Sequence, residues 1–241
     1  MNSPFLLTLV SLSLLWSSSV TFAKPPGVSV IRDLPEAAFA PPGFDSNDHS
    51  QVVVAGTFTS SCFKAGSASA DVNPLTKTIQ ITQKAYVLES SWCLQMLVPY
   101  SSVVDVGILP PGDYQVQVVS DLAAPKTLEN LSIAPASESV AGPDESLYAI
   151  AEDVSLENGV LKLRGKLPGA CVTLKDIRVL TRKSGIVEVL PLLQTKQAQS
   201  CAESFISFEK EIPVSLPWKG RTLLHVRSLN GQALNKIVEV R

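Results

Sequence analysis

The sequence predicts an all-β protein made of two tandem β-sandwich domains related by internal duplication. Short stretches alternate apolar and polar residues, and turn residues separate them roughly every 8–12 residues, which is typical of sandwiches and barrels. No stretch keeps a period of about 3.6 residues over three turns, so no helix is expected. The third observation is a set of four markers that the chain contains twice.

The repeated markers occur in one order at nearly equal spacings. In the first copy they are Gly56, Cys62, Cys93 and residues 109–112 (LPPG), and in the second they are Gly165, Cys171, Cys201 and residues 216–220 (LPWKG). Six residues separate the glycine from the first cysteine in both copies, and the cysteines lie 31 and 30 residues apart. An alternating run follows each closing glycine, with Tyr114, Val116 and Val118 in one and Thr222, Leu224 and Val226 in the other.

The elements follow from the pattern in order. In the first copy we expect strands at 28–31, 51–59, 77–83, 86–88, 93–100, 103–109, 113–119 and 127–133. In the second we expect them at 147–151, 160–167, 177–180, 186–193, 205–208, 222–226 and 236–240. Residues 137–146 are small, polar and contain proline, which predicts a linker between a domain at 24–136 and a domain at 147–241.

The N-terminus resembles a signal peptide. The run from Phe5 to Trp16 is apolar and too short for a membrane span, and Thr21 and Ala23 place small residues before a cleavage point. We therefore expect residues 1–23 to be removed and the mature chain to begin at Lys24 in a secreted or periplasmic protein; an uncleaved anchor is the alternative. The rest of the sequence has no second run long enough to span a membrane.

The cysteines predict disulfides. An even number in an exported chain indicates an oxidising compartment, and four cysteines allow three pairings. The duplication favours Cys62–Cys93 and Cys171–Cys201, one in each copy. A zinc site is disfavoured because the sequence has no Cys-x-x-Cys and only two histidines.

Each copy of about 100 residues, with one bridge, resembles an immunoglobulin-like β-sandwich. The closing part, a Leu-Pro pair with glycine, an alternating strand, a turn and a last strand, is similar to the final hairpins of immunoglobulin-like and fibronectin-like modules. The antibody signature is missing, since the cysteine spacing is shorter and no Trp lies midway between the cysteines.

Composition and motifs favour no enzyme class. A net charge of −2 gives no basic surface for nucleic acid, and we expect no cofactor and no metal. A hydrolase would need His49 or His225 beside a nucleophile, but His225 is expected to face solvent, like Gln117 at the same place in the first copy. The carboxylates Asp105 and Glu188 form no recognisable glycosidase pair, and residues 45–49 resemble only the start of a calcium loop.

The two copies differ most in the turn before the alternating strand. Trp218, Lys219 and Arg221 lie there in the second copy, where the first has Pro111 and no basic residue. Exposed aromatic and arginine side chains anchor interfaces, and a flat ring can stack on a sugar. Trp92, beside Cys93, is expected to pack near the bridge. Asn130 lies in a glycosylation pattern inside an expected strand.

We therefore predict a non-enzymatic binding protein that engages a protein or an envelope polysaccharide. The expected binding loops lie at sandwich ends, at residues 43–50, 64–70, 110–113 and 217–221. The alternatives are a structural spacer or assembly subunit, which would use exposed strand edges, and a hydrolase on a sandwich scaffold.

Overall fold

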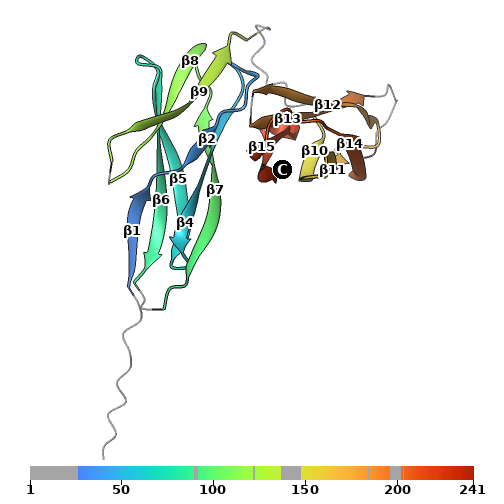
Figure 1. Cartoon of the computed structure of the whole chain (residues 1–241). Coiled ribbons are helices and arrows are strands. Elements are labelled where there is room, and N and C mark those ends of the chain that lie inside the picture. The colour runs from blue at the N-terminus through green and yellow to red at the C-terminus, as the bar shows by residue number, and fades with distance from the viewer. Residues whose placement is uncertain are drawn as a thin grey trace, which may run out of the picture.

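The structure is a computed structural model that describes residues 27–89, 92–121, 123–136, 148–183, 185–195, 202 and 204–241. Strands dominate this part of the chain, and its one helical element is the 3-10 turn η2 (Leu229–Gly231). The strands form two units, an N-terminal half and a C-terminal half (Figure 1). The signal-peptide region, the expected linker and Cys201 lie outside the described residues.

The N-terminal half consists of two facing sheets. One has the order β2-β4-β7, and the other contains β5, β6, β8 and β9, with β1 beside β6 and β3 beside β9. The strands are β1 (Val28–Asp33), β2 (Ala37–Phe39), β3 (Phe44–Asp45), β4 (Ser50–Ser60), β5 (Phe63–Asn73), β6 (Thr78–Leu88), β7 (Gln95–Gly107), β8 (Gly112–Val118) and β9 (Lys126–Ala134).

The C-terminal half also has two sheets, with the orders β10-β11-β14 and β12-β13-β15-β16. Its strands are β10 (Ile150–Glu157), β11 (Val160–Leu167), β12 (Val172–Lys183), β13 (Ile186–Thr195), β14 (Ile206–Pro213), β15 (Gly220–Arg227) and β16 (Ala233–Val240).

The two halves share most of their strand pairing, although β1 and β3 have no described counterpart in the C-terminal half. The sheet β2-β4-β7 corresponds to β10-β11-β14, and the series β5-β6-β8-β9 corresponds to β12-β13-β15-β16. Each series contains one parallel pair, β6 with β8 and β13 with β15, among antiparallel neighbours. In immunoglobulin constant domains the fourth strand lies on the opposite sheet, so that the third and sixth strands pair directly. Here β6 and β13 stay beside the strand before them, because short turns join each pair into a hairpin.

The core of each half follows the alternating pattern. Ile79, Ile81 and Val116 are fully buried in the N-terminal half, and Leu161, Leu163 and Leu224 are fully buried in the C-terminal half. Successive side chains of a strand point to opposite faces, so one set of alternating positions fills the space between the sheets. The expected inward faces of the two alternating strands, β8 and β15, are confirmed.

The two marker glycines have the same structural role. Gly56 on β4 lies opposite Tyr100 on β7, and a Cβ atom there would lie 2.7 Å from the Tyr100 ring. Gly165 on β11 lies opposite Phe208 on β14, and a Cβ atom would lie 2.8 Å from that ring. In both halves an aromatic side chain thus covers a glycine on the neighbouring strand, which explains why no larger residue stands at the marker.

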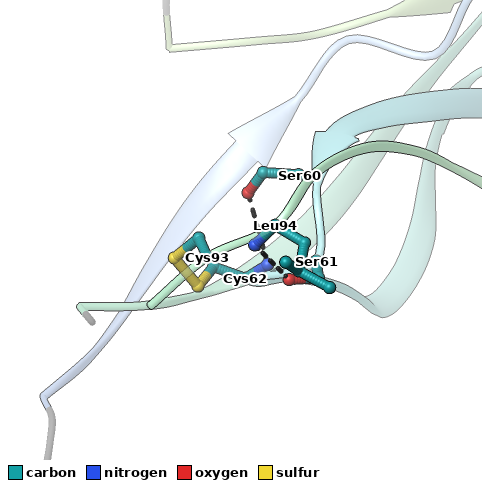
Figure 2. Close-up of a disulfide and its surroundings, with 5 residues drawn as sticks. All are labelled: Ser60, Ser61, Cys62, Cys93 and Leu94. Atoms are coloured by element: carbon teal, nitrogen blue, oxygen red, sulfur yellow. Dashed lines mark hydrogen bonds between the residues drawn. A yellow bond between two sulfur atoms is a disulfide. The ribbon is translucent and has the colours of Figure 1, made fainter. Parts of the chain in front are cut away.

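The predicted disulfide between Cys62 and Cys93 is present, with a Cα–Cα distance of 5.4 Å. Figure 2 shows the adjacent hydrogen bonds: Ser60 Oγ accepts from the Cys62 amide at 3.2 Å, and Ser61 Oγ accepts from the Leu94 amide at 2.9 Å. The bridge therefore ties the β4–β5 turn to the segment that leads into β7. The second predicted pair, Cys171–Cys201, includes a residue outside the described part of the chain and stays a prediction.

Several expectations about local structure were wrong. Residues 64–70 form part of β5 rather than a loop, and residues 95–107 form one strand, β7, where two were expected. Residues 78–88 form one strand, β6, rather than two. Trp92 is 89% exposed instead of packed beside the bridge. Among the described residues, no helix has the length and apolar character needed to cross a membrane.

The two halves are packed against each other through one face of each. Phe39 and Val53 of the β2-β4-β7 sheet form an apolar cluster with Ile186 on β13 and Leu223 on β15. Ion pairs surround the cluster, joining Glu36 to Arg221, Asp48 to Arg227 and Glu129 to Lys183. An apolar centre with a polar rim is the usual anatomy of a protein interface.

Candidate binding site

A surface cavity of about 790 Å³ lies at one end of the C-terminal half. Three segments line it: the β10–β11 turn with Asn158 and Gly159, the β14–β15 loop with Trp218 and Lys219, and the end of β16 with Glu239. Small-molecule sites commonly have volumes of about 300–1,000 Å³, so this cavity can hold a ligand of several rings. Residues 217–219 of the loop that was expected to bind a partner line this cavity, and the binding role of that loop stays a prediction.

Trp218 forms part of the cavity wall in a fixed orientation. The indole is half-buried against the core of the C-terminal half, and its Nε1 donates a hydrogen bond to Thr222 Oγ1 at 3.0 Å. Thr222 Oγ1 in turn donates to the Gly220 carbonyl oxygen at 3.2 Å. Because both hydrogen bonds lie within one turn, the ring is held without help from a ligand. Trp218 therefore caps the sandwich end and also lines the cavity.

The β10–β11 turn has positive φ angles at its two central residues, a common geometry for a tight hairpin turn. Asn158 has a φ of 52° and Gly159 a φ of 75°, and Glu157 pairs with Val160 across the turn. Positive φ at both central residues matches the type I′ hairpin turn, for which Asn-Gly is the favoured pair. The Gly159 carbonyl oxygen accepts from the Val214 amide at 2.7 Å, which joins this turn to the β14–β15 loop. Sequence reasoning missed this part of the site, although the Asn-Gly pair signals it.

The cavity carries charges of both signs. Glu157 and Glu239 contribute carboxylates, and Lys219 and Arg241 contribute cations. The carboxylate oxygens accept hydrogen bonds, the Asn158 amide both accepts and donates them, and Trp218 and Leu216 form an apolar wall. The cavity therefore combines an aromatic wall with charged and amide groups that can form hydrogen bonds with a polar ligand. No group of metal-ligating side chains is found among the described residues.

Arg221 does not line this cavity, and its role as a binding residue stays a prediction. Its guanidinium forms an ion pair with Glu36 at 3.0 Å and reaches Thr57 Oγ1 at 3.4 Å, both in the N-terminal half. Arg221 points to the opposite face of β15 from Thr222, which is buried. The alternation that places Thr222 beside Trp218 thus sends Arg221 to the interface between the halves.

His225 was expected on the surface but is only 1% exposed. Its Nδ1 donates to Asn235 Oδ1 at 2.7 Å, and Asn235 Nδ2 donates to Gln51 Oε1 at 3.1 Å in the N-terminal half. The ring also contacts Phe44 edge-on, with 5.9 Å between ring centroids. Burial lowers the pKa of His225 to about 4, so the imidazole is neutral near pH 7. The outer face of β15 is buried because the N-terminal half covers it.

Glu188 lies next to His225 in the register of β13 and β15 and is also buried. Removal from water raises the pKa of its carboxyl group, and the positive charges of Arg182 and Arg227 oppose this effect. His225 Nε2 and Glu188 Oε2 have no hydrogen-bond partner among the described atoms. Asp105, the other carboxylate considered from sequence, is exposed on β7 of the N-terminal half.

The loop at residues 43–50 faces the C-terminal half, and most of its polar groups are used there or within the loop. Asp48 forms an ion pair with Arg227 at 3.3 Å, and Arg227 also donates to the Gly43 carbonyl oxygen at 2.6 Å. Asp45 Oδ1 accepts from the Asn47 amide at 3.1 Å, as in an ordinary Asx turn. His49 and His225 both line a cavity of about 20 Å³, which has room for about one water molecule.

Two other predicted positions have structural contacts. The carbonyl oxygen of Pro111, in the 110–113 turn, accepts a hydrogen bond from Lys77 Nζ at 3.0 Å, and Tyr114 donates to Pro110 at 3.0 Å. Asn130 is exposed on β9, and its carbonyl oxygen accepts from Lys183 at 3.1 Å across the interface. The 110–113 turn is therefore closed by hydrogen bonds within the N-terminal half, whereas the loop that contains Trp218 and Lys219 borders the cavity.

Comparison with known proteins identifies one domain. Residues 52–128 match the model of a family described as the ORF11 beta-sandwich domain, a region that runs from β4 into β9. No curated protein and no solved structure matches the chain. The match covers part of the N-terminal half and agrees with the two facing sheets found there, so this half contains a β-sandwich domain similar to that family.

Proposed function

We propose that the chain is a non-enzymatic binding protein, secreted or periplasmic, that engages its partner through the cavity at the end of the C-terminal half. The supporting observation is that Trp218 and Lys219 line this cavity. These are the residues at which the second copy departs from the first, in a turn that the first copy closes with its own side chains. A change confined to one copy is what a gained binding role would produce.

The partner expected from sequence is a protein or an envelope polysaccharide, and the cavity favours the polysaccharide. Its charges of opposite sign leave no strong preference for an acidic or a basic ligand. Carboxylates and an amide beside an aromatic wall can hydrogen-bond sugar hydroxyl groups and pack against a sugar ring. A protein partner would be expected to bury a larger apolar surface than this cavity offers.

Co-sedimentation with isolated peptidoglycan tests the proposal, using the chain from Lys24 to Arg241, which retains every described residue. We expect Trp218→Ala and Lys219→Ala to lower the bound fraction, with Trp218→Ala reducing affinity about tenfold. Phe205→Ala is the matched control, since Phe205 is 69% exposed and does not line the cavity. Binding to peptidoglycan that is unchanged in Trp218→Ala would exclude the cavity as the binding site. Capture of one envelope protein that depends on Trp218 would instead make the partner a protein.

We also propose that the two halves are tandem immunoglobulin-like domains derived by duplication, with their own variant strand order. Two observations support a common origin: the shared pairing pattern with its parallel strands, and the glycine under an aromatic ring in each half. Unrelated sandwiches would not be expected to share a feature as local as Gly56 with Tyr100 and Gly165 with Phe208.

A second candidate function is assembly of a larger structure, in which the chain acts as a spacer or subunit. The observation that favours it is the edge strand β14, which pairs with β11 on one side and has no described strand on the other. Glu209, Lys210 and Glu211 on this strand oppose edge-to-edge pairing, because charged side chains protect an edge. Sedimentation velocity over a range of concentrations decides between the two: growing oligomers favour assembly, and a constant monomer favours the binding role.

A further inference from the structure

One end of the N-terminal half exposes large apolar side chains from three separate segments. They are Val28 and Val30 on β1, Leu88 on β6, Trp92 and Leu94 just before β7, and Leu97 on β7, and we call them the apolar tip. The exposed fraction is 61% for Val28, 89% for Trp92 and 71% for Leu97. Single exposed apolar residues are normal, but a contiguous group marks an interaction surface.

Hydrogen bonds and the disulfide bring the three segments together. Val28 pairs with Leu88 and Val30 with Tyr86 across the β1–β6 ladder. The Leu88 amide donates to the Cys62 carbonyl oxygen at 2.9 Å, and Cys62 is bonded to Cys93. The segment that contains Trp92 and Leu94 is thus fixed beside the end of β6. These contacts within the chain therefore fix the position of the apolar tip without a partner.

The apolar residues surround the end of the sandwich instead of covering one face. Val28, Val30 and Leu88 belong to the sheet that contains β6, whereas Leu97 belongs to the opposite sheet. In Figure 1 the ends of β1, β6 and β7 meet at the narrow end of the N-terminal half, away from the C-terminal half. A folded protein would contact one side of such an end, whereas a lipid surface can accept it from all sides.

Basic residues lie behind the apolar tip on the outer face of the β6 sheet. Lys64 is opposite Tyr86, and Lys84 is opposite Arg32, which forms an ion pair with Asp121. Lys64 and Lys84 are exposed. Cations behind exposed apolar and aromatic residues match the sequence of layers at a membrane surface, with anionic headgroups above acyl chains.

The chain enters the fold at the same end of the N-terminal half as the apolar tip. Gly27 is at this end, where its carbonyl oxygen accepts from the Glu89 amide at 2.8 Å. The 26 preceding residues join the fold here, and they include the apolar run from Phe5 to Trp16. The chain therefore enters the fold at the apolar tip.

We propose that the apolar tip is a docking surface for a lipid bilayer, inserting Trp92, Leu94 and Leu97 into the interfacial region while Lys64 and Lys84 contact anionic headgroups. The surface is independent of the cavity beside Trp218, so either can fail without the other. A bilayer contact at this end leaves the C-terminal half available for a second partner.

Flotation with lipid vesicles tests the proposal, using the chain from Lys24 to Arg241 so that the Phe5–Trp16 run cannot contribute. We expect binding to phosphatidylcholine vesicles containing phosphatidylglycerol, and we expect Trp92→Ser and Leu97→Ser each to lower the partition coefficient about tenfold. Leu75→Ser is the matched control. Leu75 is 93% exposed but lies in the turn between β5 and β6, at the opposite end of both strands, so the change should leave binding unaltered.

The charge requirement has its own test. Lys64→Gln with Lys84→Gln should weaken binding to the anionic vesicles on the order of tenfold or more and hardly change binding to pure phosphatidylcholine. Equal unfolding midpoints of all variants would confirm that these exposed positions leave the fold intact. Absence of vesicle binding, or binding that ignores Trp92 and Leu97, would overturn the proposal. A lipid-free dimer abolished by Trp92→Ser would instead assign the tip to a second copy of the chain.

Discussion

Strands β8 and β15 occupy the same place in the two halves but have different surroundings. In β8, buried Tyr114, Val116 and Val118 alternate with Asp113 and Gln115, which are exposed. In β15, all residues from Thr222 to Val226 are buried. The inward faces match because each half needs a core. The outward faces differ because the N-terminal half covers β15 and nothing described covers the same face of β8. The inward face of each strand is thus buried by the core of its own half, whereas the outward face of β15 is buried by contact with the other half.

The largest effect expected from this difference is at the centre of the interface. Leu223→Ala removes a fully buried side chain from the cluster between the halves and should cost about 2–5 kcal/mol of unfolding free energy. Gln115→Ala, the equivalent change in β8, should stay within about 0.5 kcal/mol because that side chain is exposed. Urea unfolding of both variants measures the difference, and equal costs would contradict the docked arrangement.

The next effect is a pH dependence that β15 has and β8 lacks. The pKa of His225 is lowered by burial from 6.5 to about 4, so the unfolded chain takes up a proton first as the pH falls. Stability from this residue is complete above about pH 6.5 and is lost as the pH falls through about 4. The loss amounts to about 3 kcal/mol. His225→Gln, which places the residue of Gln117 at this position, should flatten that part of the stability curve in urea titrations.

Glu188→Gln is the control for this pH dependence. The pKa of Glu188 is raised by burial, so its folded state keeps a proton to higher pH than its unfolded state. Its contribution to stability therefore falls as the pH rises through that window, opposite in sign to the contribution of His225. Glu188→Gln should stabilise the protein near neutral pH and leave the acid-side loss intact. An acid-side loss that persists in His225→Gln would show that another group causes it.

The smallest effect is the difference in unfolding free energy between substitutions of the two marker glycines. A methyl group at Gly165 would collide with the Ile150 backbone as well as the Phe208 ring, whereas at Gly56 the nearest atoms belong only to the Tyr100 side chain. We expect Gly165→Ala to cost about 3 kcal/mol and Gly56→Ala less, since a side chain yields more easily than a neighbouring strand. The position of the Tyr100 side chain is fixed by the hydrogen bond that its hydroxyl group donates to Asp33. Burial also raises the pKa of this hydroxyl group. Thermal unfolding measures both, and the reverse ranking would contradict this explanation.

The candidate site was predictable in part. The comparison of the two copies identified Trp218 and Lys219, and both line the cavity. It also selected Arg221, which lies in the same turn region but belongs to the interface. Neighbours in a strand point to opposite faces, so closeness in sequence cannot decide which of them share a site. Glu157 and Asn158 also line the cavity, but they belong to the β10–β11 turn about 60 residues earlier in the sequence. Only the folded chain places this turn beside Trp218.

The sequence by itself determined the strand-rich architecture, the inward face of each alternating strand and the pairing of Cys62 with Cys93. Each depends on local periodicity or on a spacing that the chain contains twice. Tertiary structure alone decided that His225 and Glu188 are buried, that Arg221 crosses to Glu36, and that Trp92 remains exposed. A sequence period of two indicates which side chains of a strand face the core of their own half. It does not indicate that another half of the chain packs on the outer face, because that contact depends on how two complete surfaces fit together.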